Sequence, residues 1–458
     1  MADNENKKRY DPDKDISFLC AESKKYNFID PADFARYRVK KGLRNADGSG
    51  VIAGLTRICN VHGYVMNEGE KSPVEGELVY RGIDVRKLVS GCQAENRFGF
   101  EEVAWLLLYG KLPTSHQLEV FNRALARQRE LPDTFVDDII IKCPAGNIMN
   151  ALQRSTLALY CYDDNPEEPT LENVMRQSIS LIAKMPGMMT AAYQVKRRNF
   201  DRKSMYFHLP KAEYSVAENI LRSIRSDKHF TDEEAKMLDL CLVLHAEHGG
   251  GNNSTFATRV LTSSATDTYS AIAAGIGSLK GPRHGGANQK VMQMMDAIKE
   301  NVSNWGDETE VERFLEKIIN REAGDGSGLI YGMGHAIYTI SDPRAVLLKA
   351  YAEKMVAGTE HEAEYRLIEL VEKLTPAVFQ RKKGIDAPLC ANVDLYSGLV
   401  YTMLGVPPEL ITPLFAVART VGWCAHRMEE MFTTGGKIIR PGYKAIAPRA
   451  EYVSIDQR

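Results

Sequence analysis

Beyond residue 90 the chain repeats one pattern almost without interruption: apolar residues at helical spacing, closed by glycine or proline. Residues 232–251, DEEAKMLDLCLVLHAEHGGG, follow helical periodicity and then end in three glycines, which is a strong stop signal. Residues 407–431, PPELITPLFAVARTVGWCAHRMEEM, are apolar enough for a buried or interfacial helix. Clear strand signals occur only at residues 50–90, for example GELVYRGIDV. The pattern therefore predicts an all-α protein with a short N-terminal β segment.

The chain has 458 residues, which is too long for one compact core and favours two or more domains. Amphipathic helices with charged outer faces cluster between residues 290 and 385, whereas the flanking helices are more apolar. We therefore expect a large helical domain with a smaller helical domain inserted into it. The expected boundaries are an N-terminal segment at 1–48, the first part of the large domain at 49–288, the small inserted domain at 289–394, and the return of the large domain at 395–458.

Composition excludes several classes of protein. A net charge of −2 gives no global basic field for nucleic acid or a membrane surface. Eight scattered cysteines include no C-x-x-C pair, which argues against a disulfide scaffold and for a reducing compartment. The N-terminal sequence lacks the apolar core of a signal peptide, and no apolar run approaches eighteen residues. We therefore expect a cytoplasmic protein with no membrane and no nucleic-acid partner.

Four glycine-associated or polar segments interrupt the helical pattern and carry residues able to do chemistry. They are LHAEHGGGNNS with His245 and His248, KGPRHGG with His284, YGMGHAIYTISDPR with His335 and Arg344, and ANVDLYSG with Asp394. Two further arginines stand apart from these segments, Arg419 in AVARTVGW and Arg440 in KIIRPG.

Each of these residues also has an ordinary structural explanation. His248 near a helix end can cap carbonyl groups, and Asp394 can be a helix N-cap. Arg419 can extend its charged end to water or form an interfacial ion pair, and Arg440 before a proline can be a simple loop residue. Three histidines at glycine-rich breaks, together with an aspartate and three arginines, are harder to explain in this way. We therefore expect them to share a site.

The combination of residue types suggests a reaction. Arginines bind carboxylates in bidentate fashion, so three of them imply a ligand with more than one carboxylate. A carboxylate base beside a neutral histidine donor suits removal of a proton next to a carbonyl group. His284 stands just before a predicted helix, whose positive end favours the neutral imidazole. The glycines around it would let a substrate approach the backbone closely.

A zinc hydrolase is a competing class of enzyme. The segment HAEH places His245 and His248 three residues apart, whereas a helical zinc pair with its glutamate follows H-E-x-x-H. This signal for a metal site is weak, and we predict no metal site.

The motifs resemble those of the citrate synthase family. GELVYRGIDVRKLV, HAEHGGGNNSTFATRV, SLKGPRHGGAN, GMGHAIYTISDPRA, NVDLYSGLVYTMLGVP and FAVARTVGWCAHRMEE follow in that family's order and at similar spacing. The resemblance implies an all-helical dimer, possibly a higher oligomer, whose active sites each use both subunits. It implies condensation of acetyl-CoA with oxaloacetate, hydrolysis of the citryl-CoA intermediate at entry to the tricarboxylic acid cycle, and no metal or other cofactor.

The resemblance also implies a role for each candidate residue. Asp394 is the base that takes the methyl proton of acetyl-CoA, His284 donates to the thioester oxygen, and His335 polarises the ketone of oxaloacetate. The dicarboxylate is held by His248, Arg344 and Arg419, with Arg440 reaching in from the partner subunit. The loop for the adenine end of CoA comprises Leu329, Ile330, Tyr331, Gly332, Met333 and Gly334. Ala336 stands where many bacterial members have arginine, and Met333 where an aromatic residue is common.

Two alternatives stay open at this point. A 2-methylcitrate synthase, which uses propionyl-CoA, would keep every residue named above, and one added methylene group changes binding by only about 1–3 kcal/mol. A catalytically silent paralogue is expected to lose Asp394 or His284, and both are present. Dimer versus hexamer, and regulation by nucleotides, are not decided by the sequence.

Overall fold

A computed structural model describes residues 12–45, 47–67, 70–384 and 388–458, which form two compact units. The first unit combines the described part of residues 1–53 with Arg440–Arg458, and the second unit is Gly54–Ile439. The first unit contains helices α1 (Pro12–Tyr26) and α2 (Pro31–Arg36). Within it the Lys444 ammonium group lies 5.8 Å from the centroid of the Tyr37 ring, so the two ends of the chain meet in this unit.

The second unit begins with a small antiparallel sheet in the order β1–β2–β3. Its strands are β1 (Cys59–Asn67), β2 (Glu70–Tyr80) and β3 (Ile83–Asp84). The register of β1 on β2 shifts at Gly63, where a Cβ atom would lie 2.8 Å from the carbonyl oxygen of Ile337. Glycine thus lets this hairpin pack directly on the backbone of the segment that carries His335. The expected β segment is confirmed.

The helices that follow the sheet build most of the second unit. They are α3 (Val85–Ala94), α4 (Phe100–Tyr109), α5 (Ser115–Gln128), α6 (Ile148–Ala158), α7 (Leu171–Asn199), α8 (Val216–Ile224), α9 (Asp232–His245), α10 (Asn253–Thr262) and α11 (Thr268–Lys280). The predicted stop after α9 is confirmed, because the helix ends three residues before His248. Reciprocal capping boxes begin α5, α8 and α9 at Thr114, Ser215 and Thr231, and such caps fix where each helix starts.

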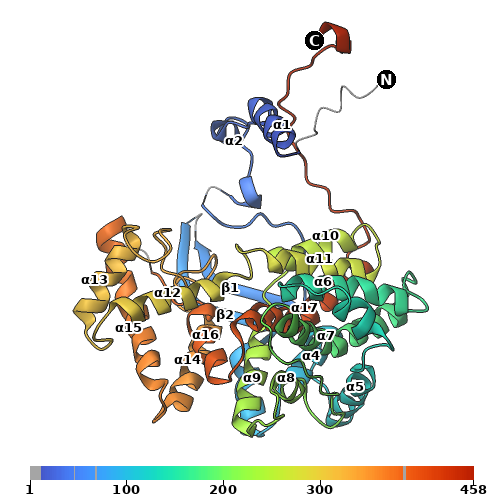
Figure 1. The fold of residues 1–458 in the computed structure, drawn as a ribbon, viewed down its shortest axis with the longest axis vertical. Coiled ribbons are helices and arrows are strands. Elements are labelled where there is room, and N and C mark those ends of the chain that lie inside the picture. The colour runs from blue at the N-terminus through green and yellow to red at the C-terminus, as the bar shows by residue number, and fades with distance from the viewer. Residues whose placement is uncertain (1–11, 46, 68–69, 385–387) are drawn as a thin grey trace, which may run out of the picture. The chain divides into compact units, whose positions relative to one another are not determined.

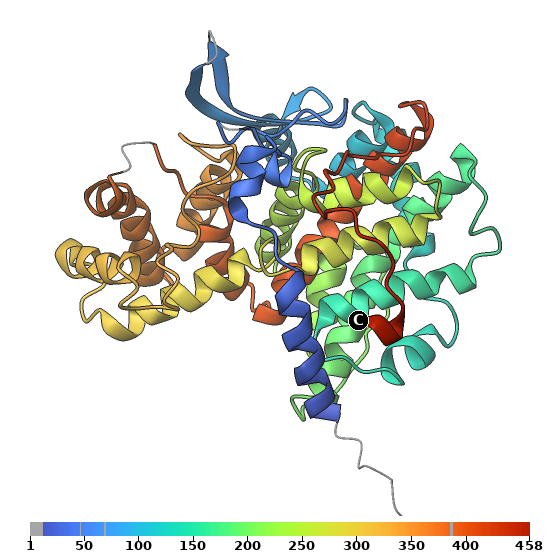
Figure 2. The ribbon, with the colours of Figure 1, turned by 90° about the horizontal axis from the view of Figure 1, so that it is seen from above.

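The remaining helices are α12 (Ala287–Asn301), α13 (Glu308–Ile319), α14 (Pro343–Val356), α15 (Glu362–Lys383), α16 (Val393–Met403) and α17 (Ile411–Phe432). Helices α12 to α15 gather on one side of α17, away from α5 to α8 (Figures 1 and 2). Their grouping agrees with an inserted helical domain. The boundaries 289–394 lie inside the second unit and stay a prediction.

Helix α17 runs through the centre of the second unit (Figure 1). It packs against α4, α7, α9, α10 and α11. Almost all of its side chains from Ile411 to Glu430 are buried. Trp423 is among the largest fully buried side chains. This placement confirms the expectation of a buried helix at 407–431. The all-α fold is also confirmed, because 59% of residues are helical.

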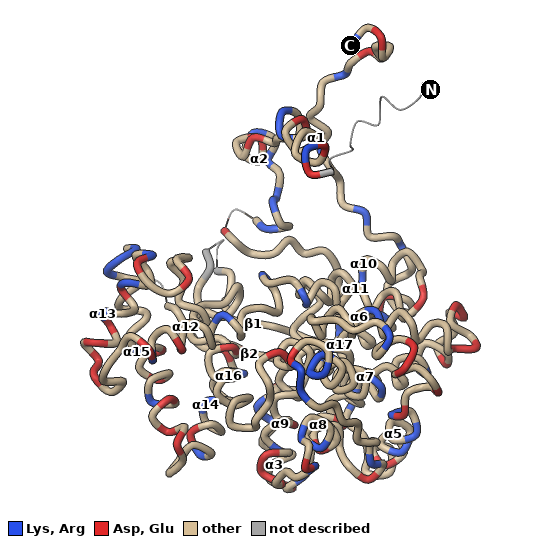
Figure 3. The backbone as a smooth tube through the Cα atoms, viewed as in Figure 1, with Lys and Arg blue, Asp and Glu red and all other residues tan. Residues whose placement is uncertain are grey.

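Charged residues of both signs are mixed over the second unit, as Figure 3 shows. This distribution agrees with the net charge of −2. Among the described residues, no helix has both the length and the apolar character needed to cross a membrane.

Candidate active site

The glycine-rich breaks between helices meet around one cavity of about 140 Å³ in the second unit. Six of the seven predicted catalytic and substrate-binding residues line it: His248, His284, His335, Arg344, Asp394 and Arg419. They come from the turn after α9, the turn between α11 and α12, the segment before α14, the first turns of α14 and α16, and the middle of α17. Segments that are far apart in the sequence therefore build one site.

The imidazole of His335 is held as a single tautomer. Its Nδ1 atom accepts hydrogen bonds from the backbone N–H groups of Ile337, at 3.1 Å, and Tyr338, at 3.2 Å. Burial lowers the pKa of His335 to about 4, so the ring is neutral at pH 7. Because Nδ1 accepts, the one ring proton is on Nε2, which is left to donate to a ligand. The Tyr338 ring stacks on the imidazole at 4.6 Å between centroids.

Asp394 lies in the first turn of α16, one residue after the helix begins. The side chain of Asn392 caps this helix by accepting from the Asp394 backbone N–H at 3.0 Å. Burial raises the pKa of the Asp394 carboxyl to about 6, with Arg344 opposing the rise. At pH 7 the group is therefore an anion of increased basicity, which suits a general base.

His284 lies in the turn before α12, as predicted from the sequence. Burial lowers the pKa of His284 to about 4, and the Arg419 charge adds to this effect. The Nε2 atom lies 3.2 Å from Ser254 Oγ, and the indole N–H of Trp423 donates to the same oxygen. The contact between Nε2 and Ser254 thus fixes the orientation of the neutral ring.

Arg344 is paired within its own segment. Its Nε and Nη2 atoms donate to the two carboxylate oxygens of Asp342 at 3.0 and 2.8 Å. Both side chains are buried, and Asp342 also caps the N-terminus of α14. Although burial alone would lower the pKa of Arg344, the charge of Asp342 raises it, so the guanidinium is firmly charged.

Arg419 is fully buried in α17 and is held differently. Its Nε donates to the carbonyl oxygen of His245 at 2.8 Å, and its guanidinium lies 4.7 Å from the centroid of the Phe415 ring. Among the residues that the structure describes, Nη1 and Nη2 have no hydrogen-bond partner. Two buried donors without partners are costly, and a carboxylate ligand would satisfy both.

His248 does not cap α9, because the helix ends three residues before it. Burial and the nearby Arg344 charge hold the pKa of His248 well below its usual value. Its Nε2 atom also lacks a hydrogen-bond partner in the described part of the chain. The ring meets that of His335 edge to face at 5.2 Å between centroids, so both imidazoles serve the same cavity.

Arg440 and the predicted CoA loop are not among the residues that line the cavity. Arg440 is exposed and belongs to the first unit, and its role stays a prediction. The backbone of the CoA loop pairs with the segment before α16, since Gly334 N–H donates to Cys390 O at 2.8 Å. Tyr331 in this loop donates to Asp325 at 2.7 Å, and Leu329 is exposed.

His245, which the sequence analysis named beside His248 without a role, also lines the cavity. Sequence reasoning missed several further lining residues, namely Asn252, Asn288, Ser397, Tyr401 and Phe415. Most of them lie within a few residues of a predicted motif, and this proximity was the available signal. Asn288 donates to Ser397 Oγ at 2.6 Å, and this bond joins α12 to α16 beside Asp394.

Within the described residues, no group of three or more histidines, cysteines, aspartates or glutamates could hold a metal ion. The carboxylate of the HAEH segment is already paired within the protein. Glu247 is engaged with His426 at 3.0 Å and with the Gly249 N–H at 2.6 Å.

Taken together, the cavity offers one carboxylate of raised pKa, neutral imidazoles and two guanidinium groups. The guanidinium groups can hold a dianionic substrate, and the imidazoles can donate to carbonyl oxygens without carrying charge. The carboxylate can remove a carbon-bound proton that such donors acidify. This set of groups fits enolisation and carbon–carbon bond formation.

Known proteins resemble the chain over almost its whole length. Residues 46–442 match the family described as citrate synthase, C-terminal domain. Citrate synthase of Synechocystis sp. is 34% identical over 404 residues, covering 88% of this chain and 89% of the relative. Citrate synthase of Saccharolobus solfataricus is 32% identical over 425 residues, covering 92% and 99%.

Solved structures agree with the sequence relatives. Citrate synthase from Thermotoga maritima superposes with a TM-score of 0.70 at 30% identity, covering 92% of this chain and 99% of the other. A ternary complex of carboxymethyl coenzyme A and oxaloacetate with citrate synthase from Thermoplasma acidophilum gives a TM-score of 0.74 at 27% identity, covering 92% and 99%. The resemblance noted in the sequence motifs is therefore confirmed: the chain belongs to the citrate synthase family of transferases, which carry out a Claisen-type condensation.

Proposed function

We propose that this chain condenses acetyl-CoA with oxaloacetate to citryl-CoA and hydrolyses that thioester to citrate and CoA. The observation that carries the proposal is the convergence of Asp394, two neutral imidazoles and two guanidinium groups on one cavity. Acetyl-CoA is a substrate in this reaction, and no cofactor is needed. The relatives named above support the same activity.

Oxaloacetate binds first in this proposal. Arg419 offers two unpartnered nitrogens to one carboxylate, and Arg344 with His248 takes the other. The ketone oxygen then faces His335, whose Nε2–H donates to it. A neutral donor polarises the ketone without adding a proton to it, which leaves the carbonyl carbon electrophilic.

Acetyl-CoA is then activated from two sides. Asp394 removes a proton from the methyl group, while His284 donates from Nδ1 to the thioester oxygen of the developing enol. In this role His284 Nε2 must accept, so the Ser254 hydroxyl group, 3.2 Å away, turns its proton from Asn252 Oδ1 to Nε2. The enol carbon attacks the ketone carbon, and the electron pair of the C=O bond moves to the oxygen that His335 contacts, which takes up a proton to become the hydroxyl group of citryl-CoA. Asp394 releases the proton that it removed from the methyl group. Water then hydrolyses the thioester, and CoA leaves as the thiol.

We infer that the working enzyme is a homodimer in which Arg440 completes the partner's site, and that it is cytoplasmic. Residues 329–334 are proposed to receive the adenine end of CoA, and residues 289–394 to close over bound oxaloacetate so that water is excluded before the enol forms. Mixing inactive Asp394→Asn protein with inactive Arg440→Ala protein tests the shared site. Heterodimers with one intact site should regain activity, and failure despite proven subunit exchange would contradict the arrangement.

The direct test of the proposed activity is CoA release in side-by-side assays of acetyl-CoA and propionyl-CoA with oxaloacetate. We expect faster turnover of acetyl-CoA and citrate as product. Faster turnover of propionyl-CoA would instead identify a 2-methylcitrate synthase, and no CoA release with either thioester would overturn the proposal.

A further inference from the structure

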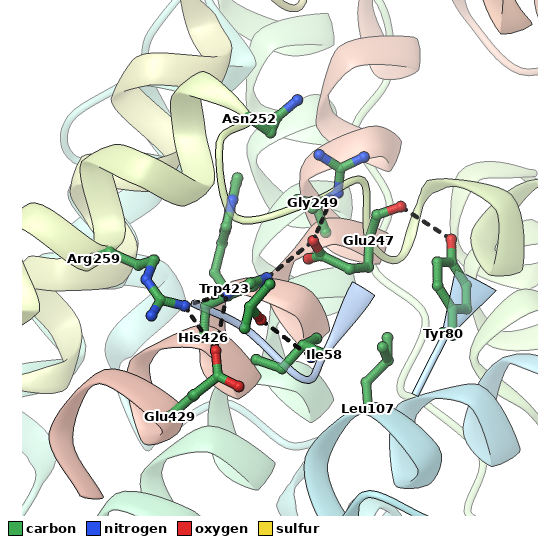
Figure 4. A network of polar contacts seen from close by, with 12 residues as sticks. Ile58, Tyr80, Leu107, Glu247, Gly249, Asn252, Arg259, Trp423, His426 and Glu429 are labelled. Atoms are coloured by element: carbon green, nitrogen blue, oxygen red, sulfur yellow. Dashed lines mark hydrogen bonds and ion pairs between the residues drawn. The ribbon is translucent and has the colours of Figure 1, made fainter. Parts of the chain in front are cut away.

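The turn that carries His248 is tied to helix α17 by a buried carboxylate, that of Glu247. The side chain of Glu247 is fully buried, and its Oε1 atom accepts two hydrogen bonds. One comes from the backbone N–H of Gly249, at 2.6 Å, and the other involves His426 Nε2, at 3.0 Å. Figure 4 shows these bonds around Glu247. The carboxylate therefore bridges the residue after His248 and the central helix.

The tautomer of His426 is set from its other side. Arg259 on α10 points Nη1 at His426 Nδ1 over 2.7 Å, and the same guanidinium pairs with Glu429 at 2.9 Å and Glu430 at 2.8 Å. A guanidinium nitrogen can only donate, so Nδ1 must accept and the ring proton must lie on Nε2. His426 therefore donates to Glu247, and the order of partners is Arg259, His426, Glu247, Gly249 (Figure 4).

Two further side chains hold the backbone of the same turn by hydrogen bonds. The Tyr80 hydroxyl group donates to the carbonyl oxygens of Glu247, at 3.0 Å, and Val243, at 3.1 Å. Arg419 Nε donates to the carbonyl oxygen of His245. The position of the turn thus determines both where His248 lies and where the guanidinium of Arg419 is anchored.

The close contact of the turn with α17 depends on a glycine. A Cβ atom at Gly422 would lie 2.1 Å from Glu247 Oε2 and 2.6 Å from the Ala246 carbonyl oxygen. Any other residue there would separate the helix from the turn. Helix α17 therefore receives the Glu247 side chain at Gly422. This glycine lies three residues after Arg419 and four before His426.

We propose that Glu247 is a positioning residue for oxaloacetate: by accepting from Gly249 and His426 it fixes the turn that places His248 and Arg419 in the cavity. The inference rests on the proposed function, because it concerns the same dicarboxylate site. Glu247 is not among the residues that line the cavity, so it acts through its neighbours and not by contact with the substrate.

A purely structural role is the competing explanation, since buried polar networks also stabilise helices. Glu430 gives a matched control. Its carboxylate is buried and pairs with Arg259 in the same network, but it makes no hydrogen bond to the described residues of the turn. A variant at Glu430 should disturb the network and leave oxaloacetate binding intact.

The experiment measures oxaloacetate affinity by calorimetry, KM for acetyl-CoA, and the thermal unfolding midpoint for Glu247→Ala, Glu247→Gln and Glu430→Ala. We expect Glu247→Ala to weaken oxaloacetate binding on the order of tenfold or more, with KM for acetyl-CoA changed far less. Glutamine can accept both hydrogen bonds through its own Oε1, so Glu247→Gln should stay within about threefold of wild type. Glu430→Ala should bind oxaloacetate as wild type does.

A second pair of variants covers the case in which Glu247→Ala does not fold. His426→Gln can place an amide N–H near the position of Nε2 and keep the donor to Glu247, whereas His426→Asn reaches only the position of Nδ1 and loses it. We expect weaker oxaloacetate binding in His426→Asn than in His426→Gln. Equal affinity in the two variants would overturn the positioning role.

The outcomes separate this inference from the proposed function. A wild-type protein that binds no oxaloacetate contradicts both. Normal wild-type binding together with unchanged affinity in Glu247→Ala, or an equal loss in Glu430→Ala, contradicts the positioning role alone. An equal loss in Glu247→Gln and Glu247→Ala would also overturn it, because the role is assigned to hydrogen-bond acceptance.

Discussion

The two arginines of the cavity are held in opposite ways. Arg344 is clamped by Asp342, a neighbour two residues away in the same segment, which occupies two of its nitrogens. Arg419 is anchored by a single bond to the His245 carbonyl oxygen, 174 residues away, and its two terminal nitrogens are unpartnered among the described residues. One arginine thus has its counter-charge built in, while the other lacks a hydrogen-bonded anion until a ligand arrives.

The difference extends to the surroundings of each arginine. We call the segment from His335 to Arg344, with Asp394, the local wall, because His335 and Arg344 are oriented by groups within three residues of them. We call His248, His284 and Arg419 the long-range wall, because their supports come from β2, α10 and α9, respectively. A wall that carries its own supports can move as one piece, which suits a closing domain. The other wall is fixed by the core.

The largest expected effect removes the base from the local wall. Asp394→Asn should lower kcat by about 10²–10⁴-fold, because the amide cannot take the methyl proton. Oxaloacetate should still bind, since both arginines remain. Steady-state kinetics and calorimetry on the same protein check this, and near-normal turnover would remove Asp394 from its role.

The clamp on Arg344 predicts a stability effect that Arg419 does not share. Arg344→Ala leaves the Asp342 carboxylate buried without its partner, and breaking a buried pair in this way costs about 3–5 kcal/mol. Urea unfolding should show the loss, and the double variant Asp342→Asn/Arg344→Ala should recover part of it. If Arg344→Ala unfolds at the wild-type urea concentration, the clamp does not stabilise the fold.

His284 tests the chemistry of the long-range wall. His284→Ala should lower kcat about 10²–10³-fold by removing a donor to the enol oxygen, with a modest effect on oxaloacetate affinity. Rate and affinity measured together check this division. Normal turnover with poor oxaloacetate binding would show that the roles of His284 and His335 are exchanged.

The pH dependence of turnover is the smallest effect and separates the carboxylate base from the two imidazoles by their pKa values. The Asp394 carboxyl has its pKa raised to about 6, so its basic form is lost as the pH falls through 6. Both His284 and His335, with pKa values of about 4, stay neutral until roughly two pH units lower. We expect the rate to fall about tenfold per unit below pH 6 while circular dichroism shows folded protein. A flat rate between pH 6 and 5 would contradict the assignment.

The sequence named the cavity residues of both walls, but it identified the supports of neither. The motif SDPR holds both Arg344 and its partner Asp342, although nothing in the motif alone pairs the two side chains. The sequence also could not show that Glu247 meets His426, because a hydrogen bond across 179 residues exists only after α9 and α17 pack together. The alternative that Asp394 caps α16 was also open until the structure showed Asn392 in that position, which leaves the Asp394 carboxylate for the cavity.

The central claim is that Arg344, in the local wall, and Arg419, in the long-range wall, hold opposite carboxylates of one substrate. Its most direct test is the ratio of dissociation constants for pyruvate, which has one carboxylate, and oxaloacetate, which has two, measured by calorimetry in wild type, Arg344→Gln and Arg419→Ala. The account predicts that wild type favours oxaloacetate by at least about tenfold, since a charge-assisted hydrogen bond contributes about 1.5–3 kcal/mol. Each arginine variant should largely lose this preference. A full wild-type preference for oxaloacetate in either variant would contradict the claim that both arginines bind the same molecule.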